Sequence, residues 1–266
     1  MIQIKGITAF SDNYIWCLFD ENKNAIIVDP GCAKSVDDFL TENNLKLQAI
    51  LITHHHPDHI GGVKPLKEKY SPEIFGYESA GFDFLDHPLS GGQTFNILNL
   101  AFKTIEVPGH TLDHIAFFTE IPYLDNKGNQ TRQASLFCGD TLFSAGCGRL
   151  FEGTAEQMLN SLNKLTSLPK NTLIYCAHEY TLNNLAFAKT LMPTNNSLTY
   201  YIEECQEKRH KGLPTIPTIL STELEINPFL RSSDSEIYSS LEKQGLVKNH
   251  NNLEVFRAVR KAKDAF

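Results

Sequence analysis

The stretch Thr53-His54-His55-His56-Pro57-Asp58-His59 decides how this chain of 266 residues is interpreted. It follows Ala49 to Ile52, an apolar run with the length and composition of a buried strand, and a pair of glycines comes soon after it. Alternate side chains of an extended backbone point to the same side, so His54 and His56 can bind one metal ion together. His55 lies between them, and we predict that it faces away and plays a supporting role.

Further candidate ligands follow the histidine pair. Asp58 and His59 come after the chain has turned, so they point elsewhere and can serve a second ion a few ångströms away. Other donors follow other predicted strands: His110 comes after the run 102–107, Asp140 after 135–138 and His178 after 172–176. Several strands of this chain therefore end on a metal-ligand type of residue.

If these strand ends meet at one rim, the donors are too many for one four-coordinate ion, and the sequence predicts a dinuclear site. We expect two groups with a shared carboxylate: His54, His56 and His110 on one ion; Asp58, His59 and His178 on the other; Asp140 between them. Zinc, iron and manganese all accept this set of imidazole nitrogens and carboxylate oxygens.

Each of these donors also has a structural interpretation. His110 and Asp140 could complete turns, His178 could be a packed core histidine, and the histidine string could be a surface cluster. His114 lies four residues after His110, but a strand is predicted over 115–118, which argues against a helical pair of ligands. The placement of all the donors at strand ends favours the metal site.

A dinuclear site indicates a reaction class. Two ions ~3.5–4 Å apart lower the pKa of a shared water toward ~7, polarise a carbonyl and stabilise a leaving anion. A hydroxide held in this way removes the need for a serine or cysteine nucleophile. The sequence therefore predicts a hydrolase.

Composition narrows the class of protein. Hydrophobic residues make up 41% of the chain and charged residues 21%, which is ordinary globular usage. The net charge of −7 argues against a general binder of nucleic acid or of anionic membranes, because both need clustered Lys and Arg. The six cysteines contain no CxxC pair, and no apolar run approaches the ~20 residues that span a bilayer. We therefore expect a cytoplasmic protein with reduced thiols, acting as a monomer on a small molecule.

The chain changes character near residue 180. Before it, strand-like runs alternate with helical patterns, including a capping box of Thr154 and Gln157, and this alternation is typical of an α/β domain. After it, helical periodicity covers 181–192, 198–211, 235–244 and 252–264. We predict a metal-binding catalytic domain over 1–180 and a helical domain over 181–266. The proline-containing stretch 213–228 is expected to be an ordered loop, and 124–132 an exposed hairpin turn.

The chain resembles the metallo-β-lactamase superfamily through its HxHxDH string and the later His, Asp and His. Within that superfamily it is most similar to the glyoxalase II (hydroxyacylglutathione hydrolase) family. The narrower resemblance extends along the whole chain and is carried by the following strings: Asp12-Asn13-Tyr14-Ile15-Trp16, Pro108-Gly109-His110-Thr111, Gly139-Asp140-Thr141-Leu142-Phe143, Ala145-Gly146-Cys147-Gly148-Arg149, Glu152-Gly153-Thr154-Ala155, Cys176-Ala177-His178-Glu179-Tyr180-Thr181, Asn227-Pro228-Phe229-Leu230-Arg231 and Ala258-Val259-Arg260-Lys261-Ala262-Lys263-Asp264.

The resemblance implies a fold and an activity. The fold is an αββα sandwich followed by a helical C-terminal domain. The activity is hydrolysis of S-(2-hydroxyacyl)glutathione thioesters, chiefly S-D-lactoylglutathione, in methylglyoxal detoxification. A metal-bridging hydroxide is the expected nucleophile, with Asp58 and Asp140 as catalytic residues and two divalent ions, foremost zinc, as cofactors. The implied substrate contacts are Arg149, Tyr180, Arg260 and Lys263.

Residue chemistry agrees with these implied contacts. Arg260 and Lys263 are three apart in a predicted helix, hence on one face, and glutathione carries two carboxylates that need such partners. Without the resemblance, the same charges would be interpreted as a solvated helix face. Tyr180 comes two residues after His178 and could donate its hydroxyl to the substrate backbone. Phe151 departs from the family, because many members have a tyrosine that contacts glutathione there.

Other functions stay open at this point. One alternative keeps the fold and changes the substrate, as in a lactonase, a β-lactamase-like enzyme or a persulfide-oxidising enzyme. A nucleic-acid-processing enzyme is disfavoured by the net charge. A non-catalytic metal-binding protein is the alternative from another class, although its ligand positions would not be expected to remain intact.

Overall fold

The structure is a computed structural model that describes residues 1–124 and 128–266. The chain forms two compact units, and each is described by itself. The first contains Met1–Glu106 and Asp113–Gly139, and the second contains Val107–Leu112 and Asp140–Phe266. The domain boundary expected at residue 180 is a different division of the chain and stays a prediction.

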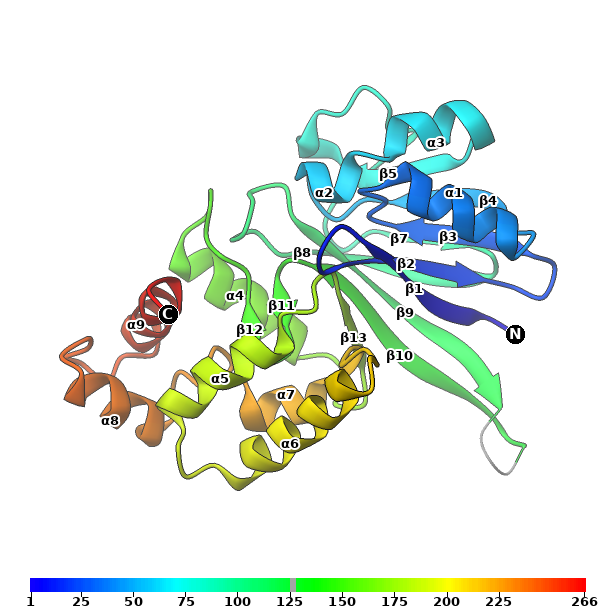
Figure 1. The fold of residues 1–266 in the computed structure, drawn as a ribbon. Helices are drawn as coiled ribbons and strands as arrows, with labels where there is room; N and C mark the ends of the chain where they lie inside the picture. The colour runs from blue at the N-terminus through cyan, green and yellow to red at the C-terminus, as the bar shows by residue number, and fades with distance from the viewer. Residues whose placement is uncertain (125–127) are drawn as a thin grey trace. The chain divides into compact units, whose positions relative to one another are not determined.

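The first unit contains a six-stranded mixed sheet (Figure 1). β1 to β3 run antiparallel, and β3 to β6 run parallel. The strands follow one another in chain order: β1 (Gln3–Ala9), β2 (Asn13–Phe19), β3 (Asn24–Val28), β4 (Lys46–Leu51), β5 (Glu73–Tyr77) and β6 (His87–Leu89). Parallel strands need covered faces, and the buried pattern of β3 and of the end of β4 agrees with this requirement.

Helices cover one face of this sheet. Figure 1 shows α1 (Ala33–Glu42) and α3 (Val63–Tyr70) lying along the sheet. The two helices bury Val36, Leu40, Val63 and Leu66 in the same cluster as the isoleucines of the sheet. These apolar residues recur at helical spacing, while most of the other residues in each helix are polar, so each helix has one face suited to the sheet. The short helix α2 (Pro57–Ile60) and the 3-10 turn η1 (Glu78–Ala80) complete this part of the unit.

A second, antiparallel set of strands belongs to the same unit. It consists of β7 (Thr94–Ile97), β8 (Leu100–Glu106), β9 (Ile115–Leu124) and β10 (Gln130–Gly139). Phe95 on β7 stacks on Phe75 of the first sheet, with ring centroids 4.9 Å apart, and packs on Phe102 at 5.6 Å. Aromatic rings therefore join the two sheets.

The expected hairpin turn joins β9 and β10. Leu124 pairs with Gln130 across the two strands, which agrees with a hairpin in this region. The tip of the predicted turn, 125–127, lies outside the described residues.

The loops after β3 and β4 approach each other backbone to backbone. A Cβ atom at Gly31 would lie 1.8 Å from the carbonyl oxygen of Asp58, so no other residue fits there without a shift of the loop. This contact brings the end of β3 against the HxHxDH segment.

The second unit is mainly helical. Its elements are β11 (Leu142–Phe143), β12 (Gly146–Cys147), α4 (Ala155–Thr166), β13 (Leu173–Cys176), α5 (Thr181–Leu191), α6 (Asn196–His210), β14 (Thr218–Ile219), α7 (Leu220–Ile226), α8 (Ser235–Lys243) and α9 (Asn252–Asp264). The rings of Phe187, Phe229 and Phe256 pack together in its core. The four helices predicted after residue 180 are confirmed within two residues at each end.

The expectation of a loop over 213–228 was wrong in part. The structure has β14 and α7 within it, and β14 pairs with β13. Pro214 and Pro217 precede these elements and Pro228 follows them, so the prolines bound the helix rather than interrupt it. α7 buries Leu220, Glu223 and Ile226, which is a tertiary reason for a short helix that local periodicity does not reveal.

Among the described residues, no helix is both long and apolar enough to cross a membrane.

The capping box of α4 gives a test of local stability. Gln157 N donates to Thr154 Oγ1 at 3.1 Å, and Thr154 N donates to Gln157 Oε1 at 2.8 Å. We expect Thr154→Ala to lower the free energy of unfolding by about 1 kcal/mol, measured by urea denaturation. Thr166→Ala at the other end of the helix is the matched control, and equal losses in both variants would contradict the capping role.

Candidate functional site

The first cluster of donors lies directly after β4. His54 Nε2 and His56 Nδ1 are 3.1 Å apart, so the two side chains point to the same side of the chain, as their spacing suggested. His55 turns the other way, and its Nδ1 lies 2.9 Å from Asp113 Oδ1. Pro57 then begins α2, whose first turn carries Asp58 and His59.

Asp58 and His59 form the second part of this cluster. Asp58 Oδ2 lies 3.5 Å from His59 Nε2. The amide of Asn13 on β2 donates to the same Asp58 oxygen at 2.9 Å. His59 is buried and Asp58 is half-buried, so the carboxylate is held at the edge of the cluster.

Asp29, at the end of β3, orients this cluster from behind. Its Oδ2 accepts a hydrogen bond from the Thr53 hydroxyl at 2.7 Å and lies 3.0 Å from His59 Nδ1. The Thr53 hydroxyl donates its one hydrogen to Asp29. In the contact of 3.0 Å between Thr53 Oγ1 and His54 Nδ1, the histidine must therefore be the donor. Both His54 and His59 are therefore protonated on Nδ1, which leaves Nε2 with a lone pair for a metal.

The second unit holds the other three predicted ligands. Asp140 lies between two histidines: its Oδ2 is 3.4 Å from His110 Nε2, and its Oδ1 is 3.3 Å from His178 Nε2. The backbone carbonyl of Arg149 accepts a hydrogen bond from His110 Nδ1 at 2.8 Å. His110 therefore presents a deprotonated Nε2 to this cluster, as His54 and His59 do in theirs.

The spacing of donors within each unit suits a divalent ion. Two ligand atoms each about 2.1 Å from a tetrahedral ion lie about 3.4 Å apart. The neighbouring donor atoms described above are 3.1 to 3.5 Å apart. With imidazole and carboxylate donors, both clusters therefore fit metal ions by distance and by chemistry.

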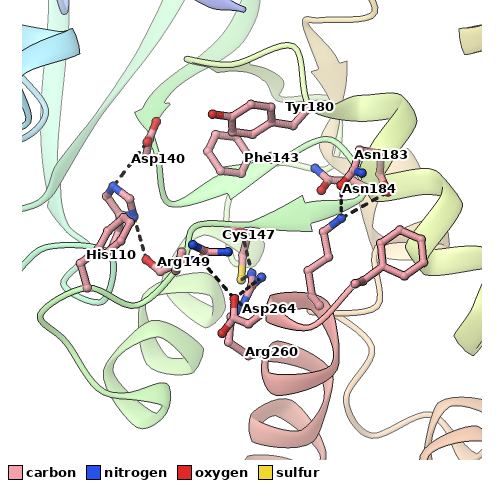
Figure 2. A pocket seen from close by; sticks show the side chains of 13 residues that line it. His110, Asp140, Phe143, Cys147, Arg149, Tyr180, Asn183, Asn184, Arg260 and Asp264 are labelled. Atoms are coloured by element: carbon pink, nitrogen blue, oxygen red, sulfur yellow. Dashed lines mark hydrogen bonds and ion pairs between the residues drawn. The ribbon is translucent and has the colours of Figure 1, made fainter.

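A cavity of about 430 Å³ lies in the second unit, within the size range of small-molecule sites. Figure 2 shows His110 and Asp140 on one side of it and Asn183 and Asn184 on the opposite side. Arg149 also lines the cavity. Two of the three metal-ligand types of this unit and all four predicted substrate contacts therefore line one cavity.

Arg260 lies in the wall of this cavity and is only 7% exposed. Its Nη1 donates to the carbonyl of Cys147 at 2.9 Å, and its guanidinium lies over the ring of Phe229 at 4.9 Å. Nε and Nη2 meet Asp264 Oδ1 at 3.0 and 2.9 Å. Arg260 is thus held on three sides and gives the cavity a fixed positive charge.

Lys263 and Arg149 are more accessible cations. Lys263 Nζ donates to the side chain and the backbone carbonyl of Asn183. Burial, with a smaller contribution from the charge of Arg260, lowers the pKa of Lys263 to about 8. The Arg149 side chain is 58% exposed, and its Nε lies 3.5 Å from Asp264 Oδ1.

Two aromatic residues stand near the histidines of the cavity. Tyr180 stacks on His178, with ring centroids 4.6 Å apart and planes 4° from parallel. Phe151 is 61% exposed and packs edge-on against His110 at 5.2 Å. Phe151 therefore presents an aromatic surface beside His110 and has no hydroxyl to donate.

A buried polar network supports the β11–β12 hairpin beside Asp140. Glu223 accepts from the backbone of Ala145 at 2.8 Å, and Asn227 donates to the carbonyls of Phe143 and Gly146 at 3.2 and 3.0 Å. Burial raises the pKa of Glu223. The network explains why the hairpin holds a non-glycine residue, Ala145, at a φ of +54°.

Comparison with known proteins identifies the family. A model described as metallo-beta-lactamase superfamily matches residues 14–122, and one described as hydroxyacylglutathione hydrolase C-terminus matches residues 179–266. A protein of Aliivibrio fischeri named hydroxyacylglutathione hydrolase is 45% identical over 267 residues, which cover 100% of both chains. The chain belongs to the hydroxyacylglutathione hydrolase family. A member from Pseudoalteromonas translucida is 46% identical over 270 residues with the same full coverage.

Comparison with a solved structure concerns the fold of this hydroxyacylglutathione hydrolase family member. The BLEG-1 B3 metallo-beta-lactamase aligns with a TM-score of 0.60 and 22% identity, covering 86% of this chain and 99% of that chain. At this identity the likeness concerns the fold alone. Together with the matching family models, it confirms the expected metallo-β-lactamase fold class with a helical C-terminal region.

Sequence reasoning missed several residues of this site. Asp29 is not among the predicted site residues, although it directly follows the strand-like run 25–28, and the same signal selected Asp140. Asn183 and Asp264 lie beside predicted contacts in the sequence, and Asp264 is four residues after Arg260 on one helix face. The role of Glu223 had no local signal, because the backbone that it supports, at Ala145, lies 78 residues away in the chain.

The orienting role of Asp29 can be tested by metal binding. We expect Asp29→Asn to weaken metal binding about 10- to 100-fold, because the amide carries no charge and no longer fixes the protonation of His54 and His59. Competition titration with a chromophoric chelator measures the affinity. Asp38→Asn, which removes an exposed partner of Lys34, is the control. An unchanged affinity in the Asp29 variant would exclude the orienting role.

Proposed function

We propose that this hydroxyacylglutathione hydrolase family member cleaves S-(2-hydroxyacyl)glutathione thioesters, chiefly S-D-lactoylglutathione, to glutathione and the 2-hydroxy acid. The observation that carries the proposal is the cavity of the second unit, where His110 and Asp140 share the lining with Arg149, Arg260 and Lys263. Metal-ligand types face the reacting group of a thioester, while cations suit the two carboxylates of glutathione. This chain is 45% and 46% identical, over its full length, to proteins named hydroxyacylglutathione hydrolase. That similarity supports the same thioester hydrolase activity.

We further propose that the donors of both units hold two divalent ions together. His54, His56 and His110 would bind one ion, Asp58, His59 and His178 the other, and Asp140 both. Zinc is the first choice, with iron or manganese as alternatives, because the nitrogen and oxygen donors suit all three. Such ions would supply Lewis acidity, lowering the pKa of a water and polarising the thioester carbonyl.

The chain's own residues would bind and orient the substrate. Lys263 and Arg149 would attract the carboxylates, and Arg260 would add a fixed charge behind them. Tyr180 would donate its hydroxyl to the peptide part of the substrate. Asp58, held by Asn13, and Asp140, held between two histidines, would orient the attacking water as catalytic residues.

The thiol in the cavity wall is not a plausible nucleophile. Cys147 is buried, and burial raises its pKa to about 11, although the charge of Arg260 opposes the shift. The thiolate is the reactive form of cysteine, so this side chain is inert at neutral pH. Direct attack by water is the route that the side chains of the cavity support.

The setting of the reaction is also a proposal. We place the enzyme in the cytoplasm as a monomer that binds a small molecule and neither nucleic acid nor membrane. All six cysteines are free thiols, as is usual in a reducing compartment. The net charge of −7 disfavours a polyanion as the partner.

Steady-state hydrolysis tests the proposed function. Purified, metal-loaded protein should cleave S-D-lactoylglutathione, followed by loss of thioester absorbance or by release of thiol. Removal of metal by a chelator should abolish turnover, and readdition of zinc, iron or manganese should restore it. A rate equal to that of buffer with the loaded protein would refute the proposal, as would full activity after complete metal removal.

The lowered pKa of Lys263 predicts a pH dependence of substrate binding. Lys263 binds a carboxylate only when protonated, so we expect KM to be flat below about pH 7 and to rise as the pH passes 8, while its charge is lost. Lys263→Ala should raise KM for the glutathione thioester about 10-fold or more and spare a small uncharged thioester. Lys263→Arg is the matched control, because it stays charged and its KM should remain flat to pH 9. Parallel KM profiles for wild type and Lys263→Arg would contradict the assignment.

A further inference from the structure

One carboxylate among the cations of the cavity has no role in the proposed function. Asp264 lines the cavity near the end of α9, beside Arg149 and Arg260 (Figure 2). Its side chain is 39% exposed. A site built only to attract anions would be weakened by this charge, because it partly neutralises both arginines.

The two oxygens of Asp264 are not used equally. Oδ1 receives Nε and Nη2 of Arg260 at 3.0 and 2.9 Å and lies 3.5 Å from Arg149 Nε. Within residues 1–124 and 128–266, no group donates a hydrogen bond to Oδ2. A charged acceptor on a cavity wall with a whole oxygen available is suited to a cationic donor group of a ligand.

The arrangement of charges resembles the complement of an amino acid. A free α-amino acid carries its ammonium nitrogen only two bonds from its carboxyl carbon, roughly 2.5 Å away. Binding both groups at once requires an anion and a cation side by side on the protein. Asp264 and Arg149, 3.5 Å apart, are such a pair on the cavity wall.

We propose that Asp264 determines specificity by binding the α-ammonium group of the γ-glutamyl end of the substrate, while Arg149 binds the adjacent α-carboxylate. This inference rests on the proposed function, since glutathione is the ligand that presents a free α-amino acid there. Apart from Asp140, which belongs with the metal-ligand types, the lining then has three cations and one anion for a substrate with two carboxylates and one ammonium. Lys263 and Arg260 are left for the other carboxylate, that of the glycine.

The direction in which N-acetylation of the substrate changes binding distinguishes ammonium binding by Asp264 from simple attraction of anions. N-acetylation of the substrate amine removes its positive charge and makes the substrate more negative. A cavity that only attracts anions would bind the acetylated thioester equally well or better. A cavity in which Asp264 binds the ammonium would reject it, because the acetyl group removes the charged donor and leaves the carboxylate desolvated.

The test compares S-D-lactoylglutathione with its N-acetyl derivative as substrates of the metal-loaded enzyme. We expect wild type to prefer the free amine by about 10- to 100-fold in kcat/KM, mostly through KM. In Asp264→Asn the preference should fall to about 2-fold or less. A merely structural role, holding Arg260 in place, would lower both values together and keep their ratio. Equal kcat/KM for the two substrates with wild type would overturn the inference.

Control variants and a binding measurement complete the design. Glu254→Gln removes a carboxylate of α9 that pairs with Arg257 and does not line the cavity, so it should leave the preference unchanged. Asp264→Glu keeps the charge and should retain a preference of at least 5-fold, a result that also serves if Asp264→Asn does not fold. Calorimetry with glutathione and N-acetylglutathione measures the same discrimination without turnover. Failure of the proposed function would be seen as no hydrolysis of either thioester, whereas failure of this inference would be seen as equal treatment of both ligands.

Discussion

A buried carboxylate at the end of β3 is the constraint on which the first metal-ligand cluster depends. Asp29 is almost inaccessible to solvent, and a charge in that position is stable only when it is hydrogen-bonded. The backbone and hydroxyl of Thr53 and the ring of His59 satisfy it. Because those bonds also set which ring nitrogen of His54 and His59 carries the proton, one satisfied charge determines both the loop shape and the direction of the two Nε2 lone pairs.

In the second unit, a neutral group rather than a carboxylate orients the ligand histidine. His110 is fixed by the backbone carbonyl of Arg149, and the hairpin after Asp140 is held by Glu223 and Asn227. Orientation of the donors is therefore built into hydrogen bonds before any ion is bound. This preorganisation lowers the cost of assembling a site from residues that are far apart in the chain.

The ligand types were predictable from local sequence, because an HxHxDH string after a strand has a definite geometry and later donors repeat the strand-end pattern. The helices after residue 180 were predictable from periodicity. The orienting role of Asp29, the short helix α7 and the free oxygen of Asp264 were not, since each depends on partners brought together only by tertiary packing. The positive charge of Arg260 was foreseen, but its burial against Phe229 and Cys147 was not.

The burial of the Cys147 thiol affects how readily this residue exchanges with glutathione disulfide. If the cavity binds glutathione thioesters as we propose, it is also open to the oxidised disulfide of glutathione, which would attach to any thiolate in the wall. With a pKa of about 11, roughly one Cys147 in ten thousand is ionised at pH 7. Thiol–disulfide exchange there is correspondingly slow, so the cavity can remain unmodified when the glutathione pool turns oxidised.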